Sequence, residues 1–501
     1  MIRTGVAIVG AGFAGLGAAL ALQRAGRDDL VILERAASVG GTWRDNTYPG
    51  VACDVPSHLY GFAAHPNPHW SATFAPGAEI RRYLEDVVER AGLGERIMLR
   101  TPLLGASWDA ADELWRIDTG GEPIAADALV LACGRLTEPH VPEIPGLESF
   151  PGPIFHTARW DGDVALAGRR VAVVGTGASA VQLVPQLARA GAEVTLFQRT
   201  PAWIVPRGGR VYTDAERERL ATHPGELARL RAELYAEGEA RFASRSGDAA
   251  ASAAAREAAL DHLAAQVDDP ALRAALTPDY AFGCKRVLLS DEFYPAVASD
   301  AVTLEPSALA RVDGATLTAA GGARSEADVL VLATGFAAAE QPYAPLVRGE
   351  DGTSLAAHWS EGMTSFGSTV VAGFPNLFVL NGPNASLGHN SAVLMIEEQA
   401  DYVVRALALR ERRGGTALRV RPEAEHDYTA EISAAAASTP WLTGGCRNWY
   451  VDDRSGRLTL LWPGTVQAFR ERLAAADGSE FDPVAAPRST YGARRGTEGE
   501  S

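Results

Sequence analysis

The sequence predicts an α/β protein with two Rossmann-like dinucleotide-binding domains, the second inserted into the first, and a helical subdomain. Three observations lead to this prediction. A strand, glycine-rich turn and helix occur twice, a strand followed by glycine flanks the second copy on each side, and a long stretch of the inserted part lacks strand patterns. The chain has 501 residues, enough for two to four domains of roughly 150 residues each.

The first copy begins the chain. An apolar run over residues 5–9 precedes the glycine-rich turn 10–15, and a helical stretch follows over residues 16–24. In such turns the glycines let backbone amides approach a pyrophosphate at the helix N-terminus, where the helix dipole favours negative charge. A second strand, 30–33, ends at an acidic residue that is placed to bind a ribose hydroxyl. The predicted nucleotide-binding residues of this copy are Gly10, Gly12, Phe13, Ala14, Gly15 and Glu34.

The second copy differs in the residues after its second strand. A strand over Arg170–Val174 leads into the turn 175–180, a helix through Leu187 and a strand over Glu193–Phe197. No acidic residue follows this strand; a cation and a hydroxyl follow instead, which favours the 2'-phosphate of NADP over the free ribose of NAD. The alternative is that the cation is a solvated surface charge. The predicted binding residues are Gly175, Thr176, Gly177, Ala178, Ser179, Ala180, Gln182, Arg199 and Thr200.

Strand-and-glycine segments at 128–134 and 328–335 flank the second copy and resemble junctions between nucleotide domains. Within the inserted part, a stretch rich in Ala, Glu, Arg and Leu opens with a capping-box pattern at Thr213 and Glu216, which predicts a helical subdomain. The expected organisation is a first nucleotide domain over 1–149 and 333–485, an inserted domain over 150–332 with its helical part at 213–275, and a flexible tail over 486–501.

Composition narrows the partners. The formal net charge is -16, and an acidic chain disfavours nucleic acid and anionic membrane surfaces, which attract clustered Lys and Arg. A small-molecule partner is therefore expected. The four cysteines are scattered with no CxxC pair, so neither a metal site nor a dithiol redox centre is indicated. We expect a cytoplasmic protein without a membrane span, as a monomer or homodimer.

A family resemblance rests on two motifs. Residues 150–161, FPGPIFHTARWD, match the fingerprint FxGxxxHxxxW(P/D), and on this match the chain is identified as a member of the type I Baeyer-Villiger monooxygenases. The similar flavin-containing monooxygenases carry an aromatic residue followed by a base at the end of this motif. Residues 40–54 also resemble the family segment GGxWxxxxYPGxxxD, which wraps the flavin and presents its aspartate near the ring. The resemblance extends from Gly5 to Ser391.

The resemblance implies a reaction. In the family, NADPH reduces FAD, and dioxygen then forms a C4a-peroxyflavin that inserts one oxygen atom next to a ketone carbonyl, which gives an ester or lactone. A fixed cation keeps the peroxide anionic, and such preorganised cations typically contribute ~10²- to 10³-fold in rate. Arg286 matches the family's catalytic arginine, Asp54 is its expected carboxylate partner, and Lys285 is expected to reach the NADP 2'-phosphate. The residues expected beside the flavin are Thr42, Trp43, Asp54, Tyr60 and Arg286.

Several alternatives stay open at this point. The main one is a flavin-containing monooxygenase that oxygenates sulfur or nitrogen atoms of small molecules; a flavin reductase and a non-catalytic nucleotide sensor are more distant. His156 is assigned a role in domain movement, with a core histidine as the alternative. Residues 388–391 precede a helix over 395–409, and they either face the flavin ring or cap the helix. Trp441 and Trp449 are expected in the core rather than in a substrate pocket.

Overall fold

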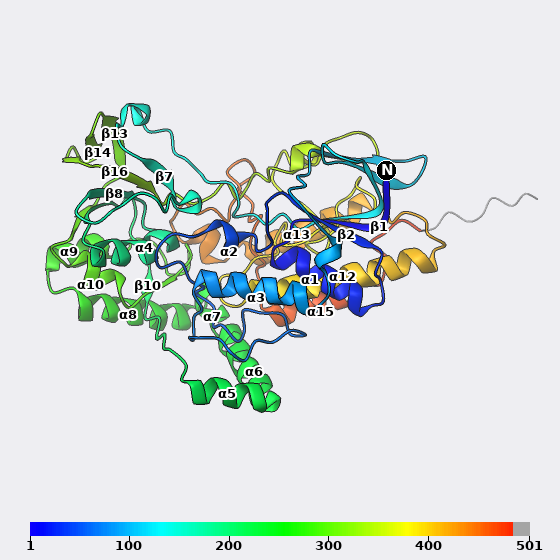
Figure 1. Cartoon of the computed structure of the whole chain (residues 1–501), viewed down its shortest axis with the longest axis horizontal. Coiled ribbons are helices and arrows are strands. Elements are labelled where there is room, and N and C mark those ends of the chain that lie inside the picture. The colour runs from blue at the N-terminus through cyan, green and yellow to red at the C-terminus, as the bar shows by residue number, and fades with distance from the viewer. Residues whose placement is uncertain (484–501) are drawn as a thin grey trace, which may run out of the picture.

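The two predicted dinucleotide folds form two separate sheets at opposite ends of the molecule (Figure 1). The computed structural model describes residues 1–483, so the predicted tail over 486–501 lies outside the described residues. Helices lie between and around the sheets, and none within residues 1–483 combines the length and apolar character that a membrane crossing requires. The predicted α/β fold class is confirmed.

The first sheet is built around β1 (Ile2–Val9), which pairs in parallel with β2 (Leu30–Glu34) and β6 (Ile124–Leu131). The further strands of the N-terminal part are β3 (Ile97–Leu99), β4 (Gly105–Asp109) and β5 (Leu114–Asp118). β5 runs antiparallel to both of its neighbours, β4 and β6. The helices of this part are α1 (Phe13–Arg24), α2 (Thr42–Asp45) and α3 (Gly77–Arg90), and the predicted strand, turn and helix order is found in β1 and α1.

The chain returns to this sheet after residue 333. β17 (Val347–Arg348) pairs with β4, and β18 (Leu377–Val379) pairs in parallel with β6. The long helix α12 (Ala392–Arg412) then packs against α1 (Figure 1). The remaining C-terminal helices are α11 (Leu355–His358), α13 (Pro422–Ala436), α14 (Pro440–Thr443) and α15 (Val466–Ala474). The second fold is therefore inserted into the first, as predicted.

The second sheet consists only of parallel strands, in the order β12-β9-β8-β16-β7. Its strands are β7 (Ile154–His156), β8 (Arg170–Val174), β9 (Glu193–Phe197), β12 (Val302–Glu305) and β16 (Val329–Leu332). Both faces are covered, because α4 (Ala178–Arg189) and α10 (Phe293–Val297) lie on one side and the small antiparallel sheet of β13 (Leu309–Asp313), β14 (Thr316–Ala319) and β15 (Arg324–Glu326) packs on the other. This burial explains the near-continuous apolar strands.

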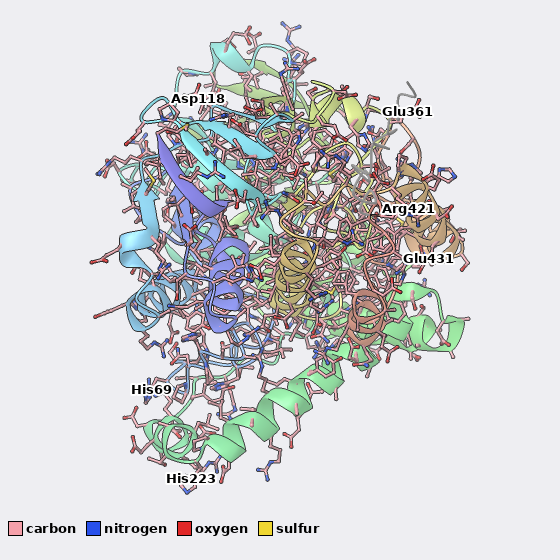
Figure 2. The ribbon with its side chains drawn as sticks, turned by 90° about the vertical axis from the view of Figure 1, so that its right-hand side faces the viewer. His69, Asp118, His223, Glu361, Arg421 and Glu431 are labelled. Atoms are coloured by element: carbon pink, nitrogen blue, oxygen red, sulfur yellow. A yellow bond between two sulfur atoms is a disulfide. The ribbon has the colours of Figure 1, made fainter. Side chains whose placement is uncertain are left out.

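The predicted helical part is a run of five helices: α5 (Asp214–Thr222), α6 (Pro224–Ala240), α7 (Phe242–Ser246), α8 (Ala249–Gln266) and α9 (Pro270–Leu276). It opens with the predicted capping box, in which Thr213 and Glu216 exchange backbone and side-chain hydrogen bonds. α5 and α6 project from the body, with His223 at their junction (Figure 2). On each side of this run, β10 (Ile204–Val205) and β11 (Leu288–Leu289) pair in parallel.

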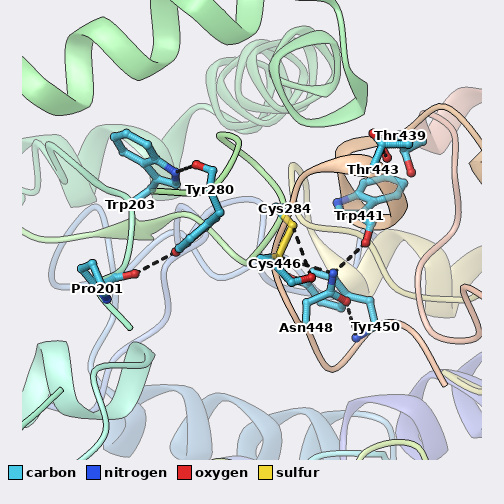
Figure 3. Close-up of a disulfide and its surroundings, with 10 residues drawn as sticks. All are labelled: Pro201, Trp203, Tyr280, Cys284, Thr439, Trp441, Thr443, Cys446, Asn448 and Tyr450. Carbon is cyan, nitrogen blue, oxygen red and sulfur yellow. Dashed lines mark hydrogen bonds between the residues drawn. A yellow bond between two sulfur atoms is a disulfide. The ribbon is translucent and has the colours of Figure 1, made fainter. Parts of the chain in front are cut away.

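A disulfide between Cys284 and Cys446 joins two segments that are 162 residues apart in the chain (Figure 3). Cys284 follows the helical part, and Cys446 lies beyond α14, so the bond ties the inserted region to the returned first fold. Sequence analysis did not predict it. Cys53 and Cys133 are free thiols.

Replacing both bonded cysteines by serine removes this tie. Closing a loop of this length restricts the unfolded chain, and we expect the double variant to lose about 2–5 kcal/mol of unfolding free energy. Its thermal midpoint, measured without reductant, should fall below that of the wild type, whereas Cys133→Ser, at a free thiol, serves as the control and should fall less. Equal thermal midpoints of the double variant and the wild type would contradict the prediction. In a separate measurement, a thiol titration of the unfolded wild type should find two free thiols before reduction and four after it.

Candidate active site

The two glycine-rich turns have the same backbone geometry. Gly10 and Gly175 have φ angles of +106° and +108°, and a Cβ on either residue would lie 2.5 Å from a carbonyl oxygen of the neighbouring strand end. Only glycine fits such a position. Each turn leads into a helix, α1 or α4, whose N-terminus has no side-chain cap, so its first amides are free to bind an acceptor such as a phosphate.

Glu34 lies beside the first turn, where sequence analysis expected it. Its carboxylate accepts hydrogen bonds from the backbone amides of Ala11 at 3.0 Å and Ala36 at 2.9 Å. It also accepts one from Arg44 Nη1 at 2.9 Å. Arg44, which sequence analysis missed, therefore balances the charge of this buried acid and holds it against the turn.

Three of the residues expected beside the first nucleotide form an aromatic cluster. The Phe13 and Tyr60 ring centroids are 4.9 Å apart, and those of Trp43 and Tyr60 are 5.6 Å apart, both edge to face. Trp43 Nε1 also donates to Tyr60 Oη at 3.3 Å. Thr42 begins α2 and Ala14 is buried in α1, so these predicted residues gather at one end of the first sheet.

The second turn has two cations beside it. Thr176 donates from its hydroxyl to the carbonyl of Thr200 at 2.9 Å, which places the Gln198–Thr200 segment against the turn. Lys285 Nζ lies 5.1 Å from the centre of the Tyr280 ring. Burial, and then the charge of Arg199, lowers the pKa of Lys285, so the two cations are close enough to repel each other. Such a pair favours a bound dianion between them.

Gln182 connects the two folds. It lies on α4, after the turn residues Gly177–Ala180, and its side-chain oxygen accepts from Tyr48 Oη at 2.9 Å. Its amide nitrogen donates to the carbonyl of Ala52 at 3.0 Å. The segment that leads to Asp54 is therefore held in part by the second fold.

Asp54 and Arg286 form the ion pair that sequence analysis predicted. Nε and Nη2 of Arg286 donate to the same carboxylate oxygen, Oδ2, at 3.0 and 2.5 Å. The side chains keep 25% and 33% of their surface exposed, which leaves the guanidinium partly open to a ligand. The adjacent pairing of β10 with β11 fixes the backbone that follows Arg286.

Both members of this pair are charged. Burial by itself would raise the pKa of Asp54, but the charge and hydrogen bonds of Arg286 outweigh it and the pKa lies below the usual carboxyl value. The charge of Asp54 in turn raises the pKa of Arg286. Arg207, which sequence analysis missed, donates to the carbonyl of Cys53 at 3.1 Å and adds positive charge beside Asp54.

The C-terminal segment reaches the same place. Tyr450 is 2% exposed; burial raises its pKa to about 12, although the neighbouring charges of Arg286 and Arg245 oppose the rise. Trp441 is 5% exposed and belongs to a small core cluster, as predicted. The same prediction is wrong for Trp449, which is 39% exposed and whose ring lies tilted against that of Tyr450, with centroids 4.5 Å apart.

The remaining two predicted segments are buried. His156 ends β7, its Nδ1 accepts from the amide of Ala158 at 3.1 Å, and its Nε2 has no partner among residues 1–483. Burial lowers its pKa to about 4, so the ring is neutral at physiological pH. Ser391 caps α12, with its hydroxyl accepting from the amide of Val393 at 3.3 Å. Residues 388–391 thus contain the helix cap that was one of the two expectations.

Comparisons with known proteins show which sequences and structures this chain resembles. The family model described as pyridine nucleotide-disulphide oxidoreductase matches residues 7–208. A protein from Streptomyces coelicolor named Baeyer-Villiger monooxygenase is 44% identical over 98% of this chain and 94% of its own length. Among solved structures, cyclohexanone monooxygenase from Rhodococcus sp. Phi1 bound to NADP+ has a TM-score of 0.86 and 27% identity over 97% of this chain and all of its own. OTEMO in complex with FAD and NADP has a TM-score of 0.85 and 27% identity over 96% of this chain and 99% of its own.

Asp54→Asn leaves the charge of Arg286 without its partner. Because the pair is a quarter to a third exposed, water screens part of the loss, and we expect the unfolding free energy near neutral pH to fall by about 1–3 kcal/mol. Folding lowers the pKa of Asp54, so its contribution is complete above the unfolded carboxyl value of about 3.9 and is lost as the pH falls through the lower folded value.

Urea unfolding of the wild type and the variant tests this. The difference between their unfolding free energies should stay constant from about pH 5 to about pH 8, since Asp54 is fully ionised in both states over that range. A difference that disappears on going from the upper to the lower end of this range would show that Asp54 titrates there and is not held as the charged partner of Arg286.

Proposed function

This chain belongs to the Baeyer-Villiger monooxygenases and is a flavoprotein monooxygenase, and we propose that it uses FAD and NADPH to insert one oxygen atom of dioxygen next to a ketone carbonyl, which gives an ester or lactone. The observation that carries the proposal is the Arg286 cation, held by Asp54 where the two folds meet. Oxygenation of sulfur or nitrogen atoms is not favoured, because it requires no fixed cation of this kind.

We assign FAD to the first fold, over residues 1–149 and 333–485. The uncapped N-terminus of α1, together with the turn of Gly10, Gly12 and Gly15, would bind the pyrophosphate. Glu34 would accept a hydrogen bond from a ribose hydroxyl, because its carboxylate oxygens have acceptor sites that the present partners do not use. The aromatic cluster of Phe13, Trp43 and Tyr60 would line the nucleotide pocket, with Thr42 at its edge.

We assign NADPH to the second fold, over residues 150–332. The turn of Gly175 and Gly177 and the uncapped start of α4 would bind its pyrophosphate. Arg199, Thr200 and Lys285 would bind its 2'-phosphate, since the mutual repulsion of the two cations is relieved when a dianion lies between them. NADPH rather than NADH is therefore the proposed electron donor.

The bound flavin supplies the activation of dioxygen, and the protein supplies position and charge. When a ketone carbonyl is attacked, its oxygen takes on negative charge. Arg286 stays protonated because Asp54 raises its pKa further, and its exposed edge would donate to that oxygen. Asp54 holds the guanidinium in place. Gln182 and Arg207 fix the backbone just before Asp54, because they donate to the carbonyls of Ala52 and Cys53.

Four finer assignments complete the proposal. The substrate is a ketone, and the enzyme is a monomer or homodimer. We place the enzyme in the cytoplasm, because NADPH is an intracellular electron donor. The Cys284–Cys446 bond would then have to be protected from the cytosolic reductants that keep most thiols reduced. His156 would couple domain movement to NADPH binding.

Arg286→Ala should retain bound FAD and its reduction by NADPH but lose ester formation by about 10²- to 10³-fold or more, because the developing oxyanion loses its cation. Anaerobic stopped-flow absorbance measures reduction, and gas chromatography measures the ester. Arg286→Lys, which keeps a charge but not the planar fork, should recover part of the activity. Ester formation at the wild-type rate in the alanine variant would refute the role of Arg286.

Arg199→Ala should raise the KM for NADPH by about tenfold or more and leave the KM for NADH nearly unchanged, since a charge-assisted contact to the 2'-phosphate is lost. Steady-state oxidation of each coenzyme measures the ratio. Arg311→Ala, at an exposed arginine of the same inserted domain, is the matched control and should change neither constant. An unchanged coenzyme ratio in the Arg199 variant would place the 2'-phosphate elsewhere.

A further inference from the structure

The Cys284–Cys446 disulfide adjoins the cations of the site. Lys285 and Arg286 follow Cys284 directly in the chain. On the other side of the bond, Cys446 lies four residues before Tyr450, which is buried and close enough to Arg286 for each to shift the pKa of the other. The bond therefore joins the loop that carries Arg286, residues 281–286, to the C-terminal loop, residues 444–450 (Figure 3).

The two loops also touch through their backbones. The amide of Ala281 donates to the carbonyl of Gly444 at 2.9 Å. A Cβ on Gly444 would lie 2.8 Å from the Cβ of Cys284 and 3.0 Å from its sulfur, so the C-terminal loop passes directly against the bond. The covalent link is therefore made where the two chains already pack closely.

The loop of Arg286 has anchors besides the disulfide. Arg286 is held by Asp54. The carbonyl of Tyr280, just before the loop, accepts from Trp203 Nε1 at 3.0 Å, and the Tyr280 hydroxyl donates to the carbonyl of Pro201 at 2.9 Å (Figure 3). This loop is therefore expected to keep its place when the disulfide is broken.

The C-terminal loop is held mainly from within its own region. The side-chain amide of Asn448 donates to the carbonyl of Trp441 at 2.8 Å, and its oxygen accepts from the amide of Tyr450 at 3.0 Å. Arg447 and Trp449 are exposed. A surface loop with little burial of its own opens readily once its tie to a neighbour is removed.

The two bonded cysteines differ in exposure. Cys284 is fully buried, whereas Cys446 is partly exposed, so an external thiolate approaches the bond from the Cys446 side. The mixed disulfide that a monothiol forms there is reversed by the adjacent Cys284 thiolate, whereas a dithiol completes the reduction. Burial raises the pKa of Cys53 and raises that of Cys133 to about 12. Both free cysteines therefore stay protonated and do not exchange with the bond.

We propose that this disulfide makes oxygenation depend on thiol redox state, with the oxidised enzyme coupled and the reduced enzyme uncoupled. The inference rests on the proposed function, since it concerns regulation of the same site. One thiolate of a dithiol attacks the sulfur of Cys446, the S–S bond breaks, and Cys284 leaves as a thiolate. The second thiol of the reductant then displaces Cys446. The reductant becomes a disulfide, and its two electrons and two protons end on the two cysteines.

Reduction frees the C-terminal loop, while the loop of Arg286 keeps its own anchors. The sites proposed for NADPH and FAD are then intact, but Tyr450 no longer shields Arg286 from water. Water that enters screens the guanidinium and weakens its interaction with a developing oxyanion. NADPH is still consumed, but its electrons pass to dioxygen and form hydrogen peroxide instead of ester.

The test uses the FAD-loaded wild type before and after incubation with dithiothreitol. Alkylation and mass spectrometry of the peptides that contain Cys284 and Cys446 define the two states. We expect the ester formed per NADPH consumed to fall by about fivefold or more on reduction, and the rate of anaerobic flavin reduction to stay within about twofold. Removal of the dithiol and oxidation with glutathione disulfide should restore the ester yield, whereas reduced glutathione in place of dithiothreitol should leave the bond intact.

Variants separate the bond from other effects of the reductant. Cys446→Ser should match the reduced wild type and show no further response to dithiothreitol. Cys133→Ser, at a free thiol, is the matched control and should respond as the wild type does. Cys446→Ala repeats the test if the serine variant does not fold. Hydrogen exchange, which needs no turnover, should be faster over residues 444–450 in the reduced wild type than in the oxidised form.

Three results would overturn the inference and leave the proposed function intact. The first is an equal ester yield per NADPH in the two verified redox states. The second is a bond that survives treatment of the folded enzyme with dithiothreitol, and the third is a reduced enzyme whose flavin reduction falls as far as its ester yield. Failure of the oxidised enzyme to form an ester from linear, cyclic and aryl ketones would instead count against the proposed function.

Discussion

The ion pair between Arg286 and Asp54 depends on the docking of the two nucleotide folds. Asp54 follows helix α2 of the first fold, which carries Trp43, and Arg286 lies beside the short ladder of β10 and β11 in the inserted part. An arginine side chain is long and flexible, and fixing it costs conformational entropy. The carboxylate supplies two charge-assisted hydrogen bonds that offset this cost. The cation is therefore in position only when both folds are.

The docking relies on contacts to backbone groups, which change little with side-chain motion. Gln182 and Arg207 of the inserted part bind the carbonyls of Ala52 and Cys53. On the other side, Glu239 of α6 accepts from the amides of Val466 and Gln467 at the start of α15. The disulfide adds a covalent tie close to Arg286. Three segments far apart in the chain thus hold one guanidinium, which explains why the site cannot form within either fold alone.

Sequence analysis predicted those parts that local patterns encode. β8 and β9 have the predicted bounds, because apolar strands buried on both faces end sharply at glycine or polar residues. The pairing of Asp54 with Arg286 came from the family motifs. The small antiparallel sheet of β13 to β15 and the disulfide were not predicted, since partners 162 residues apart leave no local spacing to recognise. Arg245 and Tyr450 lie outside every motif, and only the packing of α7 and the C-terminal segment brings them to the site.

The surroundings of Arg286 suit it to the chemical step rather than to binding of the neutral ketone. Arg286 already has a carboxylate partner, so it attracts a neutral ketone weakly and gains most when negative charge develops on the carbonyl oxygen. An interaction that strengthens on the way to the transition state raises the rate of the chemical step.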